Sequence, residues 1–235
     1  MMDVTERGTI SNTAREVAQL LDGNGLHGLV NVAGIGTSGP LEYVSLEEMR
    51  HVFEVDVFGQ LAVTQAFLPM LRKAPGRIVN ISSVGAHIAI PFGGVLTACK
   101  AAFGLLSDAL RLELHPFGMR VCTIEPGAIA TPAVEKTLGN VEAIIRHLPP
   151  EGVQRYAQML RTFTRRAYAR ERMGSPPDVV AKAVQHALTA KRPRIRYVVG
   201  KDARGLALLP RILPDRLLDA MRTKVFGLTE AAARQ

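Results

Sequence analysis

The sequence is poor in cysteine and in aromatic residues: it has two cysteines, no tryptophan and an aromatic share of 5%. Cys99 and Cys122 do not form a close pair, so the chain lacks the disulfide framework of a small secreted protein. The opening stretch MMDVTERGTI lacks the succession of charged, apolar and small residues that marks a secretory leader. Together these absences predict a cytoplasmic protein.

Long apolar runs are also missing. No stretch approaches the ~18 consecutive apolar residues of a membrane-spanning helix, so we expect no membrane span, while association with a membrane surface stays open.

Positive charge is in excess, with a formal net charge of +8. Its densest stretch, residues 161–173, places aromatic residues between arginines but is typical of a helix with a solvated basic face. No nucleic-acid fold signature accompanies it, so we expect no nucleic-acid partner.

What the sequence does contain is an alternation of short Val/Ile-rich runs with longer stretches of helical spacing. This alternation predicts an α/β fold with a parallel sheet covered by helices. A chain of 235 residues, 47% of them hydrophobic, suits one domain that spans residues 1–235. We expect strands at 28–34, 77–82, 120–127 and 194–200, and helices at 11–23, 45–73 and 95–118. Ser45, followed by Glu48, is a capping box at a helix start.

Two segments depart from this rhythm. Residues 128–177 carry five prolines around a basic helix, and we expect an irregular substrate-loop insertion that covers a ligand. Residues 203–235 are expected to form a C-terminal helical tail, amphipathic and basic up to residue 228. We favour packing of this tail on the body or on a second subunit over a position on a membrane, because two prolines interrupt its apolar stripe.

Five short motifs then follow one another in a fixed order. Together they resemble the short-chain dehydrogenases/reductases over Asp3 to about Gly200. The sequence around them is similar to that of the branch that acts on retinoids, steroids and other lipophilic alcohols. The resemblance implies a Rossmann-like three-layer sandwich with a mainly parallel sheet, and an NAD- or NADP-dependent oxidoreductase of a lipophilic alcohol or ketone. The motifs are Asp3-Val4-Thr5, Asn31-Val32-Ala33-Gly34, Asn80-Ile81-Ser82-Ser83, Lys100, and Pro126-Gly127 followed by Thr131.

The resemblance also implies the site residues. Catalytic positions are implied at Ser83 and Lys100, at position 96, where the family has a tyrosine and this chain has Leu96, and at Asp56, where the family has an asparagine. No metal site is implied. Contacts with NAD or NADP are implied at Asp3, Val4, Asn31, Ala33, Gly34, Lys100, Pro126, Gly127 and Thr131.

The chemistry explains why position 96 matters. Hydride transfer at a carbinol carbon requires a proton transfer at its oxygen, and a phenol can provide it only if its pKa of about 10 is pulled toward neutrality. Lys100, one helical turn from position 96, would supply that field, and Ser83 would hydrogen-bond the reacting oxygen. Leu96 has no ionisable group and can only pack. A carboxylate at Asp56 would either pair with Lys100 or repel a developing phenolate.

The largest departure is at the start of the chain. The family opens with two strands and a glycine-rich turn that holds the cofactor pyrophosphate at a helix N-terminus, whereas this sequence matches the family only from Asp3. The stretch GIGTSG, residues 34–39, is no substitute, because it follows the fourth strand of the family's order and ends in a loop rather than opening a helix. We therefore expect weak dinucleotide binding and an incomplete Rossmann-like domain. The strand at 28–34 would expose an unpaired apolar edge, which predicts a homo-oligomer or pairing with a related subunit.

Two functions remain open at this stage. The chain is an oxidoreductase of a lipophilic alcohol or ketone, impaired or inactive as written, or it is a non-catalytic pseudoenzyme or scaffold that pairs through the helices at 45–73 and 95–118. The retained motifs show ancestry, while Leu96 and the missing turn count against turnover.

Overall fold

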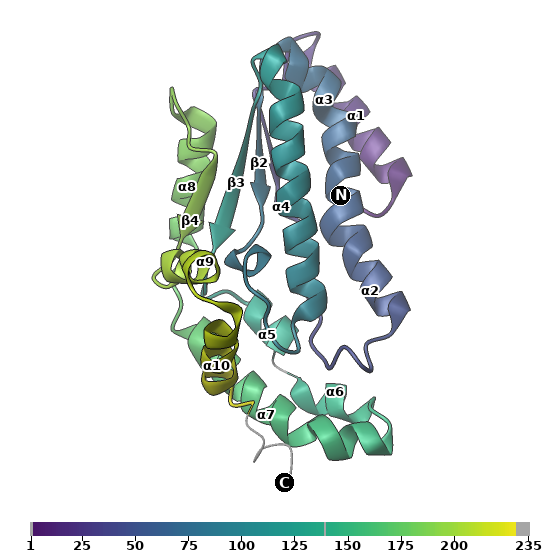
Figure 1. Ribbon diagram of the computed structural model, residues 1–235. Helices are drawn as coiled ribbons and strands as arrows, with labels where there is room; N and C mark the ends of the chain where they lie inside the picture. Colours follow the sequence, from purple (N-terminus) through teal and green to yellow (C-terminus); the bar gives the residue numbers. More distant parts are fainter. Residues whose placement is uncertain (1, 139, 229–235) are drawn as a thin grey trace.

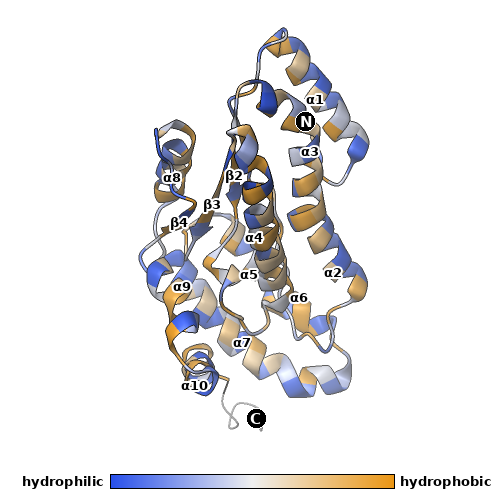
Figure 2. Ribbon diagram, turned by 45° about the horizontal axis from the view of Figure 1, so that its top comes forward, coloured by the Kyte–Doolittle hydropathy of each residue, from blue (hydrophilic) through white to orange (hydrophobic). Residues whose placement is uncertain are grey.

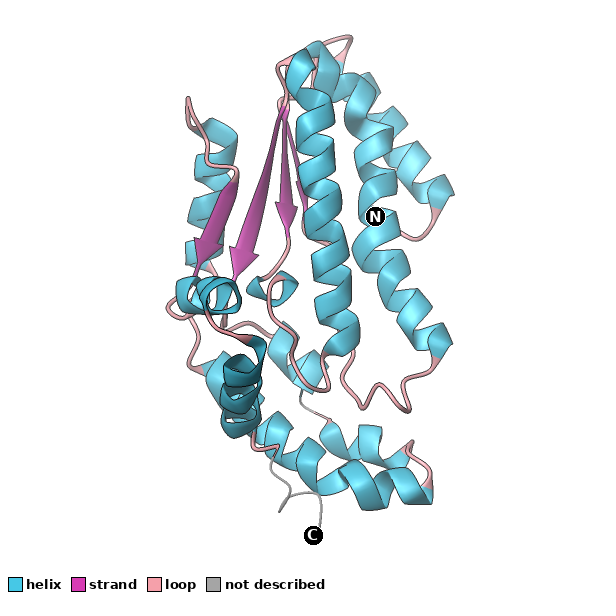
Figure 3. Cartoon of the chain, viewed as in Figure 1, coloured by secondary structure: helices cyan, strands magenta, loops and turns pink. Residues whose placement is uncertain are grey.

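The Val/Ile-rich runs form a parallel sheet with the strand order β1-β2-β3-β4. The computed structural model describes residues 2–138 and 140–228. Each strand lies within its expected run but is shorter, because pairing ends before the polar and glycine residues at the run's ends. In Figures 1 and 3 the strands point toward one end of the molecule. The strands are β1 (Gly28–Asn31), β2 (Arg77–Ile81), β3 (Arg120–Pro126) and β4 (Arg196–Val199).

Helices cover the sheet unequally. The helices α1 (Arg7–Leu21), α3 (Gln60–Lys73) and α4 (Gly94–Leu114) lie on one face, and α8 (Asp178–Thr189) lies on the other (Figure 1). The buried core follows this division: Ile78 packs with the residues of α3, while Val79 packs with those of α8. The three-layer α/β fold is confirmed. Among the described residues β1 pairs only with β2, so its other edge is unpaired.

The first helix begins earlier than expected. The Asp3 carboxylate accepts hydrogen bonds from the Thr5 N–H at 2.8 Å and the Thr5 hydroxyl at 2.7 Å, which makes a tight turn. The helix α1 starts directly after this turn, at Arg7 rather than at residue 11. Short polar side chains that bond to nearby backbone groups commonly initiate turns and helices in this way.

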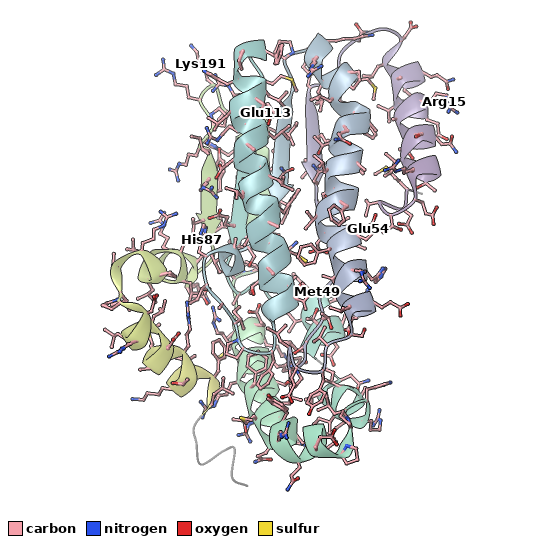
Figure 4. All side chains as sticks on the ribbon, turned by 45° about the vertical axis from the view of Figure 1, so that its right-hand side comes forward. Arg15, Met49, Glu54, His87, Glu113 and Lys191 are labelled. Carbon is pink, nitrogen blue, oxygen red and sulfur yellow. The ribbon has the colours of Figure 1, made fainter. Side chains whose placement is uncertain are left out.

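The helix expected over residues 45–73 is continuous but not uniform. It consists of α2 (Leu46–Phe53), the π-helical segment η1 (Glu54–Gly59) and α3. Figure 4 marks Met49 and Glu54 along it. The capping prediction is confirmed, because the Ser45 side chain accepts a hydrogen bond from the Glu48 N–H at 3.0 Å.

The segment 128–177 is mostly helical, which corrects the expected irregular insertion. It contains α5 (Ala133–Leu138), α6 (Val141–Arg146) and α7 (Pro150–Arg172). Pro150 occupies the first turn of α7, where the amide hydrogen it lacks would have no helical partner. These helices lie beyond the carboxyl ends of the strands (Figure 3), so prolines mark the helix starts rather than a loop.

The tail folds into α9 (Ala203–Ile212) and α10 (Asp215–Phe226), separated at Pro214. Ala203, Leu218 and Phe226 are buried, which agrees with packing of the tail on the body. Residues 229–235 of the predicted tail lie outside the described residues. Two short 3-10 turns, η2 (Val84–Ala86) and η3 (His115–Phe117), flank α4.

Candidate functional site

A cavity of about 1000 Å³ opens at the carboxyl ends of the strands. Its walls come from β1, the ends of β2 and β3, the first turn of α4, the helices α5, α7 and α8, and Phe226 of α10, and they extend along the sheet to Leu188 and Thr189 at the C-terminal end of α8. The lining is apolar, and Arg170 and Glu171 are its charged members. A cavity of this size and character suits a lipophilic molecule with a single polar group.

Several predicted site residues share this cavity. Ser83, Leu96, Pro126, Gly127 and Thr131 all line it. Ser83 follows β2 in an extended conformation, and its Oγ accepts a hydrogen bond from the Gly85 N–H at 3.0 Å. Parallel strands deliver the residues that follow them to one edge of the sheet, which explains why segments far apart in sequence meet here.

Leu96 projects from the first turn of α4 against the loop that follows β1. A Cβ placed on Gly36 would lie 3.5 Å from Leu96 Cδ2, so the loop runs directly over the leucine. Leu96 thus occupies a packed position on the cavity wall and offers no proton donor or acceptor.

Lys100 lies one turn further along α4 and is engaged in an ion pair. Its Nζ is 2.8 Å from Oδ2 of Asp56, whose side chain is fully buried. The other carboxylate oxygen of Asp56 accepts a hydrogen bond from the Ile35 N–H at 2.7 Å. A Cβ on Gly34 would lie 3.3 Å from both Asp56 Oδ2 and Lys100 Nζ. Of the two roles left open for Asp56, the structure shows pairing with Lys100.

Asn31 lies inside the protein rather than at the cavity. Its Nδ2 donates to Thr64 Oγ1 at 2.9 Å and to Asn80 Oδ1 at 2.8 Å, and Asn80 Nδ2 donates to Ser107 Oγ at 2.8 Å. These four side chains are buried and link β1 and β2 to α3 and α4. The network lies at the start of the loop that carries Ala33 and Gly34; both residues are exposed, and the Ala33 carbonyl accepts a hydrogen bond from the Gln60 side chain. Contact between these residues and a cofactor stays a prediction.

Asp3 and Val4 are not among the cavity residues. The Asp3 carboxylate serves the turn before α1, and the Val4 carbonyl oxygen would be 2.6 Å from a Cβ on Gly59. The start of the chain therefore packs on the π-helical segment, and a cofactor contact there stays a prediction as well.

A buried charge cluster escaped the sequence analysis. Glu125 of β3 is 1% exposed; its carboxylate lies 3.0 Å from Nε2 of His87, which Figure 4 marks, and 2.5 Å from the Arg196 guanidinium. Arg196 also pairs with Asp108 of α4. A charged residue inside the apolar run 120–127 was the available signal, because such a residue is buried only with partners.

A second polar group borders the cavity at the C-terminal end of α7. Burial raises the pKa of the Glu171 carboxyl. Burial also raises the pKa of Asp202, but hydrogen bonds and charge from Arg170, together with the Ala128 N–H, outweigh burial and leave that pKa below its ordinary value. A Cβ on Gly127 would collide with the Asp202 carboxylate, so this position requires glycine. The loop after β3 is thereby fixed to α9.

Two kinds of feature are absent from the described residues, a membrane-spanning helix and a group of metal ligands. Within residues 2–138 and 140–228 no helix combines the length and apolar character needed to cross a bilayer. Over the same ranges no three His, Cys, Asp or Glu side chains are grouped as metal ligands.

The cavity residues fit the nicotinamide end of a dinucleotide better than its phosphates. Ser83, Gly127 and Thr131 offer polar groups and backbone beside an apolar wall. Phosphates need a helix N-terminus that opens directly from a glycine-rich turn after a strand. No helix among the described residues begins in this way: the loop at 34–39 after β1 leads to α2 through residues 40–45.

Comparisons with known proteins agree with this geometry. The sequence profile described as short chain dehydrogenase matches residues 1–141. The chain is 36% identical to retinol dehydrogenase 5 of Mus musculus over 231 residues, which cover 95% of this chain and 72% of that protein. It is 34% identical to dehydrogenase/reductase SDR family member 9 of Bos taurus over 227 residues, which cover 93% and 71% of the two chains.

Solved structures show the same fold. A short-chain dehydrogenase from Streptomyces avermitilis superposes with a TM-score of 0.65 at 27% identity and covers 96% of this chain and 76% of that one. A short chain dehydrogenase from Burkholderia cenocepacia in complex with NADP gives a TM-score of 0.67 at 25% identity and covers 94% and 76%. The chain therefore belongs to the short chain dehydrogenase family of oxidoreductases, with a Rossmann-like fold and NADP-bound structural neighbours.

Proposed function

We propose that the chain binds a lipophilic alcohol or ketone in the cavity beside Ser83 and that its turnover as an NAD(P)-dependent oxidoreductase is impaired. The observation that carries this proposal is the cavity itself: it is large, apolar and bordered by Ser83 together with Leu96. Retinol dehydrogenase 5 is named for a lipophilic alcohol, which supports this substrate class.

Ser83 is the residue that we assign to the substrate oxygen. Its hydroxyl retains a free donor when its oxygen accepts from the Gly85 N–H, so it can donate to a carbonyl or alcohol oxygen. The apolar walls would contact and orient the carbon skeleton. A nicotinamide dinucleotide, when bound, supplies or accepts the hydride.

Impairment follows from Leu96 and from the ion pair at Lys100. Positioned proton transfer typically contributes about 10²- to 10⁴-fold in rate, and Leu96 can contribute none of it. Lys100 is held by Asp56 at 2.8 Å, so its charge is largely compensated. Binding and orientation of the substrate remain and sustain a residual rate.

The test is Leu96→Tyr, made in this chain preceded by the first two strands and glycine-rich turn of a retinol dehydrogenase relative. We expect kcat on a lipophilic secondary alcohol to rise about 10²-fold or more, because the phenol lies one turn from Lys100. The addition of Asp56→Asn should raise it further by freeing Lys100.

The matched control is Leu96→Phe, which adds the ring without the hydroxyl and should leave kcat near that of the Leu96 protein. If the Leu96 protein already turns over as fast as the tyrosine variant, another group transfers the proton and the claim of impairment is wrong.

A non-catalytic scaffold is the second candidate, and exposed apolar residues favour it. Leu105 and Leu112 of α4 are 73% and 64% exposed, and Phe58 of the adjoining helix is 55% exposed. Such side chains suit pairing through the long helices. A chain that light scattering shows to be monomeric at high concentration would exclude pairing of this chain with itself through these helices.

A further inference from the structure

The cavity has a polar position that the proposed chemistry at Ser83 does not use. Glu171 lies in the last turn of α7, lines the cavity and is half-buried. Phe163, Ala167 and Glu171 follow one another at intervals of four residues and all line the cavity, so they mark one side of the helix. Figure 2 shows hydrophobic and hydrophilic residues along α7. Glu171 thus places a carboxyl group at the end of an apolar row.

No cation neutralises this carboxyl group. Arg170, the other charged residue of the cavity, forms an ion pair with Asp202 and donates to its carboxylate from Nε at 3.0 Å. Arg172 lies over the Tyr168 ring, 5.7 Å from its centroid, and is not among the cavity residues. Across residues 2–138 and 140–228 no ion pair includes Glu171. The local charge beside the cavity is therefore negative when Glu171 is ionised.

The surroundings of Glu171 leave its carboxylate incompletely compensated. Burial opposes ionisation and raises the pKa of the carboxyl, and the negative charge of Asp202 acts in the same direction. The positive charge of Arg170 and a hydrogen bond from the Ile129 backbone act against burial but do not outweigh it. An ionised carboxylate has about four acceptor sites, so it can accept further hydrogen bonds. A cationic donor in the cavity would therefore be stabilised here.

We propose that Glu171 binds the protonated amine of a lipophilic ligand in this cavity. An alkylammonium group brings three N–H donors and a positive charge, so it hydrogen-bonds the carboxylate and neutralises it. A fatty acid of the same length would meet a like charge, and an alcohol would bring one donor and no charge. The place of the ligand rests on the proposed function, and its class becomes narrower: a lipophilic amino alcohol or amino ketone, with its oxygen at Ser83 and its nitrogen at Glu171.

Displacement of Nile red, a neutral lipophilic dye, from the full chain tests this preference with decylamine, decanol and decanoic acid at neutral pH. We expect decylamine to displace the dye at a concentration about tenfold lower than decanol, and decanoic acid to require the highest concentration. The net charge of +8 would favour the opposite order for ligands held on the surface, because it attracts decanoate and repels decylammonium. The expected order therefore reports a local negative charge.

Variants assign the preference to one side chain. Glu171→Gln keeps the shape of the side chain and should remove the advantage of decylamine over decanol. Glu171→Lys should make decanoic acid a better ligand than decylamine, a gain that a damaged fold would not produce. The matched control is Glu135→Gln on α5, an exposed residue outside the cavity lining, which should keep the order of the parent. Circular dichroism checks that each variant is folded.

The possible outcomes distinguish amine binding from the proposed function. If the three ligands displace the dye at similar concentrations, or if decylamine keeps its advantage in Glu171→Gln, the cavity takes lipophilic ligands but Glu171 does not bind the amine. Amine binding at Glu171 is then overturned while the proposed function stands. If the dye does not bind, or if none of the three ligands displaces it, the cavity takes no lipophilic ligand and both are overturned.

Discussion

Two groups of polar side chains lie along α4, one beneath the helix and one at its cavity end. The first is fully linked by hydrogen bonds, whereas the second has an apolar residue at its centre. Beneath α4 the hydrogen bonds of Asn31, Asn80 and Ser107 connect two strands to two helices. At the cavity end Ser83 and Lys100 stand beside Leu96, where the proton-transfer group of the chemistry would be. The first group stabilises the fold and the second belongs to the reaction site that we propose, so a change in one need not affect the other.

Breaking the buried ion pair between Lys100 and Asp56 should have the largest effect on stability. Lys100→Met leaves the fully buried Asp56 without its partner and should cost about 3–5 kcal/mol in the free energy of unfolding, measured with urea. The double variant Lys100→Met/Asp56→Asn should recover most of this loss, because an amide still accepts from the Ile35 N–H. If the free energy of unfolding of Lys100→Met lies within about 1 kcal/mol of that of the parent, the pair contributes no more than an exposed ion pair does.

Asn80→Ala and Ser83→Ala separate the two groups directly. Asn80→Ala leaves buried partners unsatisfied and should destabilise the fold by about 2–3 kcal/mol. Ser83→Ala removes one hydrogen bond to the Gly85 N–H at the cavity and should cost about 1 kcal/mol or less, yet it should lower kcat in the Leu96→Tyr protein. Equal losses of stability in both variants would contradict the comparison.

The smallest effects should appear in the pH dependence of stability. Because the pKa of Glu171 is raised in the folded state, its stabilising contribution is complete below the ordinary value of 4.5 and is lost as pH rises through the raised value. Glu171→Gln should therefore gain stability relative to the parent near neutral pH but not in acid. Urea unfolding at both pH values measures this difference.

Asp202→Asn is the control of opposite sign. Its pKa is lowered, so its contribution is present above the ordinary value of 3.8 and is lost as pH falls through the lowered value. Asp202→Asn should be less stable than the parent near neutral pH, and the difference should vanish in acid. The same sign in both variants would show that one of the two assignments is wrong.

Local patterns predicted local structure well. The Ser45 cap and the four strand runs followed from short-range chemistry that does not depend on distant residues. The expected helix at 95–118 was also found, with its last turn tightened into η3. The segment 128–177 was expected to be irregular but is mostly helical. The sequence alone does not distinguish a proline in the first turn of a helix from a proline that ends one.

The rest depended on partners far apart in the chain. The sequence left two roles for Asp56, and only the approach of α4 to the loop after β1 decides for pairing. The cluster of Glu125, His87, Arg196 and Asp108 joins four segments whose contact follows from strand order. The Asn31 amide lies among buried partners that no local pattern specifies, and contact of this residue with a cofactor stays a prediction.

The π-helical segment at residues 54–59 has a consequence for how the helix tolerates insertions and deletions. A π turn holds an extra residue compared with an α turn, so the segment absorbs one residue while the helix continues on either side. Removing one residue before Asp56 within 54–59 would restore plain α geometry and would shift the position of Asp56 around the helix axis, because a π turn places more residues in each turn than an α turn. The helix would survive the deletion, but the carboxylate would turn away from Lys100. The number of residues in this turn thus decides whether Asp56 compensates the charge of Lys100.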